Sequence, residues 1–185
     1  MENELEKQYI NSIYEGTKYD FDFYNKFINI TKKGKVLDLG CGVGSVSNYL
    51  SDFGYECIGY DIDEYHIKMA KKYKSNLNLC VGDIKNIPFQ ETKATGAVYA
   101  YCLHCLKDEE IIQSFKSCNK NLTDEGTILI LTTCKMDIMP SFYVNILNGQ
   151  KIILFLEQAG FKVKVFKYFN DNYSICVIAT KYKNI

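Results

Sequence analysis

Apolar residues alternate between two spacings along most of the chain, and this alternation predicts the architecture. Short apolar runs predict strands at residues 35–39, 55–60, 77–81, 96–101, 127–132, 162–169 and 174–180. Between them, apolar residues at helical spacing predict helices at 45–53, 64–73, 108–121 and 152–159. Strands that alternate with helices through short loops favour a mostly parallel sheet with helices on both faces.

The two ends of the chain depart from this pattern. The first 33 residues show amphipathic helical spacing, with apolar anchors expected at Tyr9, Ile13, Phe23, Phe27 and Ile30. The gap between the last two strands, around residues 170–172, is too short for a parallel crossover, so these strands should pair as an antiparallel hairpin. We therefore expect an α/β fold with a doubly wound seven-stranded sheet, mostly parallel, with an antiparallel C-terminal hairpin strand.

Composition narrows the possible partners. The 22 basic and 22 acidic residues cancel, and no basic stripe suggests a nucleic-acid partner. No apolar run reaches the roughly 20 residues that span a bilayer, so no membrane association is expected. The start, MENELEKQYINS, is polar and unlike a signal peptide. We expect a cytoplasmic protein whose eight cysteines remain thiols.

A glycine-rich turn follows the first strand. Residues 38–44 read DLGCGVG, and glycines allow a tight turn that presents backbone N–H groups at a helix start. Gly42 and Gly44 are two positions apart, unlike the last two glycines of the dinucleotide fingerprint G-x-G-x-x-G. Asp38 would repel a pyrophosphate but can pair with an ammonium group. The turn therefore suits a phosphate-free cofactor with a cationic amino group, such as S-adenosylmethionine.

Two further acids follow the next two strands, at the sheet edge where ligands of such folds bind. Asp61 could accept hydrogen bonds from both hydroxyls of a ribose, and Asp83 could accept one from an adenine amino group, with Ile84 covering the ring. Each acid alone could equally be a solvated loop residue or a helix cap. Three acids after three successive strands, beside a glycine turn, favour a shared ligand.

These segments resemble the motifs of the class I (Rossmann-like) S-adenosylmethionine-dependent methyltransferases of small-molecule type. Residues 36–44 (VLDLGCGVG) are similar to the first motif and 59–63 (GYDID) to the second. Residues 81–84 (VGDI) through 87–89 (IPF) resemble the third, and 97–106, ending LHCL, the segment after strand four. The resemblance covers roughly residues 34–180. It implies methyl transfer from S-adenosylmethionine to a small-molecule acceptor, with release of S-adenosylhomocysteine.

The resemblance also implies which residues hold the cofactor. They are Asp38, Gly40, Cys41 and Gly42, with the backbone of Ala100 and Tyr101, at the methionine part, and Asp61, Ile62, Asp83 and Ile84 at the ribose and adenine. The family often binds the cofactor carboxylate with an Arg or Lys from the amino-terminal region. This chain has no arginine, which leaves Lys18, Tyr14 or Tyr19 as candidates without a choice among them.

The acceptor side should be built from the amino-terminal helix and the loop after the fifth strand, with Tyr14, Tyr19, Phe142 and Tyr143 as substrate-side residues. Short insertions favour a small acceptor, or a site that a partner completes, in a monomer or homodimer. We expect a single domain, 1–185. Its parts are a helical cap (1–33), a cofactor-binding core (34–133), a substrate-side loop (134–150) and a C-terminal helix and hairpin (151–185).

His104 is the candidate catalytic residue. A sulfonium is a good leaving group, so the main task is to align the reactants and exclude water. His104 follows the fourth strand, and an unperturbed pKa near 6.5 suits a general base if the acceptor must lose a proton. A structural role in the loop is the alternative. Cys102 and Cys105 form a lone C-x-x-C pair, which is weak support for zinc, and no metal site is expected.

Three other functions remain open from the sequence. The first is a non-catalytic scaffold or regulator that binds S-adenosylmethionine. The second is a thiol or metalloid methyltransferase, because Cys102, Cys105 and Cys134 follow strands four and five. The third, an NAD-dependent oxidoreductase, is disfavoured by the glycine spacing and by Asp38.

Overall fold

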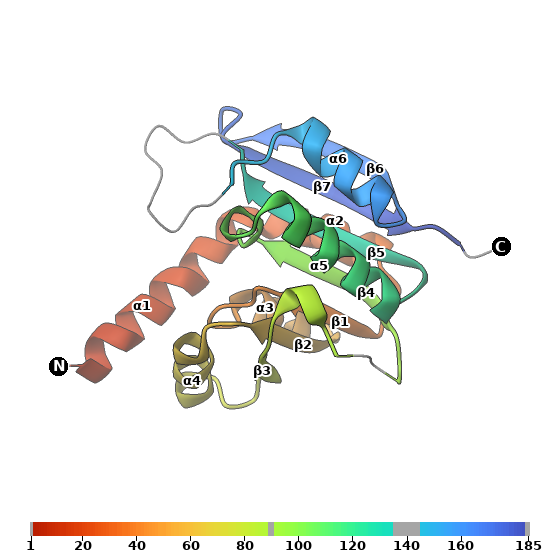
Figure 1. The fold of residues 1–185 in the computed structure, drawn as a ribbon. Coiled ribbons are helices and arrows are strands. Elements are labelled where there is room, and N and C mark those ends of the chain that lie inside the picture. The colour runs from red at the N-terminus through yellow and green to blue at the C-terminus, as the bar shows by residue number, and fades with distance from the viewer. Residues whose placement is uncertain (1, 89–90, 135–144, 184–185) are drawn as a thin grey trace.

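A seven-stranded sheet lies between two layers of helices in the computed structural model, which describes residues 2–88, 91–134 and 145–183 (Figure 1). β7 is antiparallel to both of its neighbours, and the other adjacent strands are parallel. The predicted fold class is therefore confirmed. In sheet order the strands are β3 (Leu79–Val81), β2 (Glu56–Asp61), β1 (Lys35–Leu39), β4 (Ala94–Ala100), β5 (Leu122–Thr133), β7 (Ser174–Lys181) and β6 (Phe161–Phe169).

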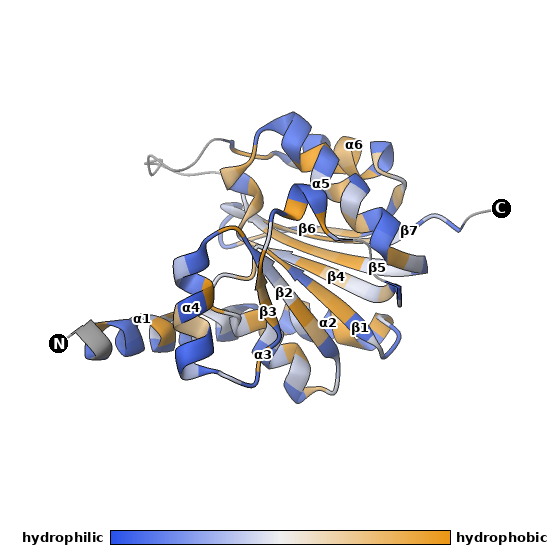
Figure 2. Ribbon diagram, turned by 60° about the horizontal axis from the view of Figure 1, so that its bottom comes forward, coloured by the Kyte–Doolittle hydropathy of each residue, from blue (hydrophilic) through white to orange (hydrophobic). Residues whose placement is uncertain are grey.

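Successive side chains along the strands pack alternately into two separate cores, one on each face of the sheet. On β5, Ile128 and Ile130 pack on the face covered by α5 (Asp108–Asn121) and α6 (Gly149–Gln158). Leu129 and Leu131 pack on the opposite face, under α2 (Phe21–Ile30) and α3 (Ser45–Asp52). Figure 2 shows the strands as an apolar layer, with polar residues on the outer helices. Burial on both faces explains the nearly continuous apolar runs in the sequence.

Helices α1 (Glu2–Thr17) and α4 (Glu64–Tyr73) form a smaller cluster at the β3 end of the sheet. Ile10 is the buried contact of α1 there, with 3% exposure. The predicted anchors Phe23 and Phe27 are buried, but Tyr9, Ile13 and Ile30 are 42%, 37% and 53% exposed. The prediction for these three was wrong because single-sequence periodicity does not show which stripe of a helix a neighbour covers.

Local signals fix several element boundaries. The side chain of Asp63 accepts hydrogen bonds from the first turn of α4, and Gly54, with φ of +79°, follows the end of α3. Three short 3₁₀ turns, η1 (Lys18–Asp20), η2 (Ile84–Asn86) and η3 (Leu103–Cys105), connect the longer elements. No helix among the described residues is long and apolar enough to cross a membrane.

The edge strand β6 carries exposed lysines at positions 162, 164 and 167, a pattern that discourages edge-to-edge pairing with another sheet. It joins the sheet through β7 alone. The turn between them holds Asn170, Asp171 and Asn172 at φ of +51°, +52° and +70°. Asn and Asp tolerate this left-handed conformation better than most residues, which explains how so short a turn closes the predicted hairpin.

Candidate functional site

The glycine turn lies between the ends of β1, β2 and β4. The N–H groups of Gly40 and Cys41 both donate to the carbonyl oxygen of Tyr60, at 2.8 and 3.1 Å, which ties the turn to β2. Gly40 has φ of +77°, and a Cβ there would lie 2.7 Å from Sγ of Cys102. A Cβ on Gly42 would meet nothing within 4 Å. The turn is thus tightly packed at Gly40 and opens onto free space at Gly42.

Asp38 is a buried carboxylate at the end of β1, with 1% exposure. Its Oδ2 accepts hydrogen bonds from the N–H of Ser47 at 2.9 Å and from Oγ of Ser47 at 2.7 Å. Burial raises the pKa of Asp38 to about 6, although the two Ser47 bonds oppose this change. At neutral pH Asp38 is therefore largely ionised, and no cation among the described residues forms an ion pair with it.

Asp61 holds the glycine turn from the end of β2. Its Oδ2 accepts from the N–H of Gly42 at 2.7 Å, and its Oδ1 accepts from the N–H of Asp63 at 2.9 Å. A carboxylate oxygen has a second acceptor position, so each oxygen can still accept a hydrogen bond from a ligand. Asp61 can therefore order the turn and bind a hydroxyl at the same time.

Asp83 begins the 3₁₀ turn η2 beyond β3. Its Oδ1 accepts from the N–H of Lys85 at 2.9 Å. The ammonium of Lys85 lies 3.6 Å from Oδ2 of Asp83 and 2.7 Å from Glu110. Asp83 is thus both a cap and a member of a charge pair, and it holds Ile84 at the start of η2.

Two adjoining cavities lie along this edge of the sheet. The Asp38 chamber, of about 320 Å³, reaches from the glycine turn to α1 and Asp20. The Asp61 chamber, of about 790 Å³, reaches along the ends of β2, β3 and β4. Both are lined by Tyr9, Ile13, Gly40, Gly42 and Tyr101. These shared residues place the two chambers side by side.

The residues that the family resemblance assigns to the methionine, ribose and adenine parts of the cofactor all line these chambers. The Asp38 chamber contains Asp38, Gly40, Cys41, Gly42, Ala100 and Tyr101. The Asp61 chamber contains Gly40, Gly42, Asp61, Ile62, Asp83, Ile84, Tyr101 and His104. This placement brings them together around one space. Their roles toward a ligand remain predictions.

Tyr14 and Tyr19, the predicted substrate-side residues that the structure describes, do not line either chamber. The hydroxyl of Tyr14 donates to the carbonyl of Val43 at 3.3 Å, and Tyr14 lines a different hollow. Tyr19 is 91% exposed. Lys18 pairs with Glu15 at 2.7 Å and lines neither chamber. None of the three candidates for the cofactor carboxylate lines either chamber. The other two substrate-side residues, Phe142 and Tyr143, lie outside the described residues.

Helix α1 presents a different face than expected. The residues of α1 that line the Asp38 chamber are Tyr9, Ser12, Ile13, Gly16 and Thr17. Their spacing of i, i+3, i+4, i+7 and i+8 is that of one helical stripe. Part of the exposed surface of Tyr9 and Ile13 therefore faces the chamber, and the rest faces solvent. This stripe of mixed polar and apolar residues was the sequence signal for the face of α1 that lines the chamber. A search for apolar positions alone does not detect it.

His104 lies on η3 and lines the Asp61 chamber, with 5% exposure. Burial lowers the pKa of His104 to about 4. The imidazole is therefore neutral near pH 7 and a weaker base than an exposed histidine. His104 can contribute a neutral, oriented ring to the chamber wall, and its proposed role as general base remains a prediction.

The three cysteines of the thiol alternative have separate partners or surroundings. Sγ of Cys102 donates to the carbonyl of Leu39 at 3.1 Å, and Sγ of Cys134 donates to that of Asn172 at 3.1 Å. Burial raises the pKa of Cys102 and of Cys105, which lowers their reactivity. Within the described parts of the chain, no three His, Cys, Asp or Glu side chains could hold a metal ion.

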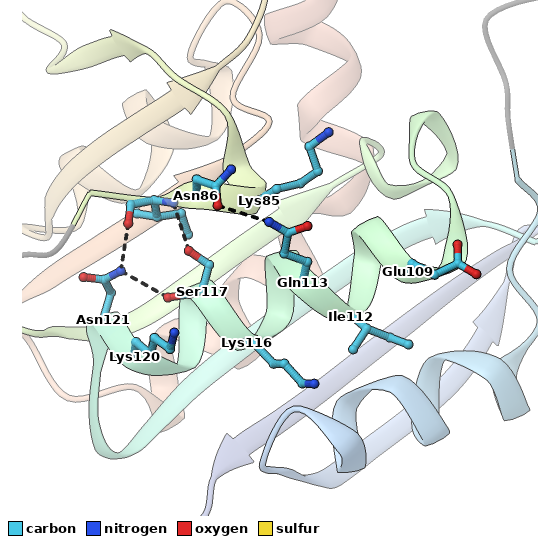
Figure 3. A pocket seen from close by; sticks show the side chains of 10 residues that line it. Lys85, Asn86, Glu109, Ile112, Gln113, Lys116, Ser117, Lys120 and Asn121 are labelled. Carbon is cyan, nitrogen blue, oxygen red and sulfur yellow. Dashed lines mark hydrogen bonds between the residues drawn. The ribbon is translucent and has the colours of Figure 1, made fainter.

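A third hollow, of about 530 Å³, lies between η2 and α5 (Figure 3). Its wall is a network of hydrogen bonds: Gln113 donates to Asn86 at 3.1 Å, the N–H of Ile87 donates to Ser117 at 2.9 Å, and Asn121 donates to the Ser117 carbonyl at 3.1 Å. These bonds fasten the segment after β3 to α5. The hollow shares Lys85 with the Asp61 chamber but contains none of the strand-end acids.

Comparison with known proteins gives consistent results. The family described as "Methyltransferase domain" matches residues 37–130. An uncharacterized methyltransferase of Staphylococcus carnosus (strain TM300) is 32% identical over 113 residues, which are 60% of this chain and 54% of that protein. The chain spans about half the length of the curated relatives it matches.

Solved structures show the same fold. The PH0226 protein of Pyrococcus horikoshii OT3 superposes with a TM-score of 0.79 at 24% identity, over 90% of each chain. The glycopeptide N-methyltransferase MtfA, solved with S-adenosylmethionine, gives a TM-score of 0.71 at 14% identity, over 86% of this chain and 92% of that one. With the sheet order, the glycine turn and a family match over half its length, the chain belongs to the methyltransferase-domain family, with the class I Rossmann-like fold.

Proposed function

We propose that the protein binds S-adenosylmethionine across the two chambers and transfers its methyl group to a small-molecule acceptor, releasing S-adenosylhomocysteine. The observation that carries the proposal is the convergence of Asp38, Asp61 and Asp83, from the ends of three neighbouring strands, on adjoining cavities beside the glycine turn. MtfA, which has the same fold, is solved with this cofactor.

The chemistry of the chambers fits the cofactor. Asp38 offers a buried anion for the amino group, and Asp61 offers acceptor positions for ribose hydroxyls. Ile62 and Ile84 provide apolar surface for a base in the Asp61 chamber. No described lysine lines the Asp38 chamber, so hydroxyl donors are the side chains available there to bind the carboxylate. Those that line it are Tyr9, Ser12, Thr17, Tyr24, Ser45 and Tyr101.

Bound S-adenosylmethionine supplies a methyl group on a positively charged sulfur. The protein's contribution is to hold that sulfur at the junction of the chambers and to exclude water. Tyr101 is fixed there, because its N–H donates to the carbonyl of Leu131 at 2.8 Å. Tyr9 and Ile13 form the wall from α1. Neutral His104 adds a ring that carries no charge to repel the sulfonium.

The test is replacement of Asp61 with Asn. We expect Asp61→Asn to weaken binding of S-adenosylhomocysteine by about 10- to 100-fold, because charge-assisted hydrogen bonds contribute roughly 1.5–3 kcal/mol. Isothermal titration calorimetry measures this affinity. The matched control is Asp52→Asn, which removes the same charge from an exposed position on α3.

Two results would contradict the proposal. One is the absence of binding heat from S-adenosylmethionine and S-adenosylhomocysteine in folded wild-type protein. The other is equal affinity in the Asp61 and Asp52 variants. Because Asn cannot accept hydrogen bonds from the Gly42 and Asp63 N–H groups at both of its side-chain positions, thermal unfolding of each variant should accompany the titration.

A further inference from the structure

Asp20 is a second buried carboxylate in the Asp38 chamber. It lies at the end of η1, is 6% exposed and lines the cavity. Its Oδ1 accepts a hydrogen bond from the hydroxyl of Tyr101 at 3.1 Å. Among the described residues, no lysine lines this chamber and none forms an ion pair with Asp20. Burial raises the pKa of Asp20, against the effect of the Tyr101 bond.

The charges of the proposed cofactor do not explain why a second carboxylate, that of Asp20, is buried in this chamber. S-adenosylmethionine carries an ammonium, a sulfonium and a carboxylate, so its net charge is +1. Ionised Asp38 already balances that charge. A second buried carboxylate is unfavourable unless another positive group approaches it. An ionised Asp20 would therefore leave the chamber with an unmatched negative charge when the cofactor is bound.

The position of Asp20 indicates where the additional positive group lies. The sulfur links the methionine and adenosine parts, so it must lie at the junction of the chambers if each part occupies one of them. Tyr101 lines both chambers, and its hydroxyl contacts Asp20. Asp20 is thus one hydrogen bond away from a residue of the junction.

We propose that Asp20 selects the methyl acceptor and that the acceptor is a small amine, which enters as its ammonium ion. The proposal rests on the proposed function, because it takes the cofactor to occupy both chambers. In this arrangement Tyr101 is a positioning residue, since its hydroxyl fixes the orientation of the Asp20 carboxylate. Asp20 itself contacts the acceptor.

The transfer balances without another reactant. The ammonium gives one proton to the Asp20 carboxylate, which leaves a neutral amine with a free electron pair. That pair forms the nitrogen–carbon bond to the methyl group while the carbon–sulfur bond breaks, and its electrons stay on sulfur. The product is a methylated ammonium ion, and Asp20 passes its proton to solvent. The raised pKa of Asp20 makes it a better proton acceptor than an exposed carboxylate.

The experiment measures binding to protein saturated with S-adenosylhomocysteine, and does not depend on turnover. Three primary amines (methylamine, propylamine and 2-phenylethylamine) are titrated beside the alcohols of the same shape (methanol, 1-propanol and 2-phenylethanol), with NMR shifts as the readout. We expect at least one amine to bind about tenfold or more tightly than its alcohol. Asp20→Asn should remove this preference and leave the affinity for S-adenosylhomocysteine within about twofold.

Two variants control the experiment. Asp22→Asn removes the same charge from an exposed position in the first turn of α2 and should keep the amine preference. Tyr101→Phe keeps the Asp20 carboxylate but removes its hydrogen bond, and should reduce the preference. Asn at position 20 can still accept the Tyr101 hydrogen bond, so the Asp20 variant is expected to fold.

Each outcome has a defined meaning. No amine preference in the loaded wild-type protein, or an equal preference in Asp20→Asn, overturns the inference. A large loss of S-adenosylhomocysteine affinity in Asp20→Asn also overturns it, because Asp20 would then hold the cofactor. If S-adenosylhomocysteine fails to bind the wild-type protein, the proposed function fails as well. Normal cofactor binding without amine preference defeats this inference alone.

Discussion

The buried carboxylate of Asp38 lowers the free energy of unfolding but offers an anion to a ligand. Its carboxylate is buried, two hydrogen bonds from Ser47 hold it, and burial raises its pKa to about 6. An exposed aspartate ionises near pH 3.9. The unfolded chain therefore loses this proton more readily than the folded protein. Above pH 6 the fold holds a charge that pairs with no described cation and that a ligand cation would compensate.

The pH dependence of Asp38 gives a first prediction. From pH 4 to pH 6 the folded state binds the proton more tightly than the unfolded state, so the contribution of Asp38 to the free energy of unfolding decreases as pH rises. The total decrease is roughly 3 kcal/mol. Asp38→Asn should lack this decrease. Urea unfolding at several pH values measures both proteins.

The same substitution should act on ligand binding in the opposite sense. Because an ammonium favours ionised Asp38, wild-type affinity for S-adenosylhomocysteine should rise as pH increases through about 6. In Asp38→Asn this rise should be absent, so the affinity of the variant should fall increasingly below that of wild type as pH increases through about 6. Parallel stability curves for wild type and variant across pH 4–7 would contradict the account of Asp38.

The sequence revealed some site residues and concealed others for physical reasons. Asp38, Asp61 and Asp83 could be found because they directly follow strands, and strand ends share one edge of the sheet. Asp20 and Tyr9 could not, because their place in the site depends on how the α1–α2 segment packs across that edge. Tyr14 and Tyr19 lie outside the chambers for the same reason.

At the scale of elements, capping decides which boundaries a sequence can predict. Helices α4 and α5 begin and end at the predicted residues, and both have capping interactions at their first turns. Helix α6 begins three residues before the prediction, because the side chain of Asn148 caps it by accepting from the N–H of Lys151. β5 begins five residues early, because α5 passes directly into it. Apolar periodicity gave no signal at either point.

Helix α1 is the element whose docking should matter most for the site. Ile10 is buried in the cluster that contains Cys41 and Val43 of the glycine turn. We predict that Ile10→Ala weakens this docking, since burying an isoleucine contributes roughly 2–5 kcal/mol relative to alanine. Amide hydrogen exchange in residues 2–17 should become at least tenfold faster, and affinity for S-adenosylhomocysteine should fall.

Leu5→Ala is the matched control, because Leu5 lies on the same helix with 66% exposure. It should leave both the exchange rates and the affinity close to wild type. Similar exchange rates in the two variants would show that Ile10 does not dock the helix.

At the scale of the whole molecule, the eight thiols report on the fold and the site together. All eight cysteines are free, and Cys105 is the exposed one. It lines the Asp61 chamber, where burial and the nearby Asp61 raise its pKa. We predict that Cys105 is the first thiol to react with Ellman's reagent in the native protein, and faster as pH rises. Absorbance at successive pH values measures this.

Ligand protection extends the test. S-adenosylhomocysteine in the Asp61 chamber should slow the reaction of Cys105 severalfold, because it would cover that wall. Cys105→Ser should abolish the fast phase without changing the slower ones. A fast phase that persists in this variant would place the accessible thiol elsewhere.

The place of β7 between β5 and β6 governs the order in which the sheet can form. The strand latest in sequence is internal, and β6 pairs with no other strand in the sheet. During synthesis β6 (residues 161–169) is made before β7, the strand with which it pairs. β6 therefore cannot form its hydrogen bonds to the sheet until the chain has been made as far as residue 181. Truncation by even one strand would therefore remove two strands from the sheet, leaving β5 as its edge and removing β6, one of the elements that α6 contacts.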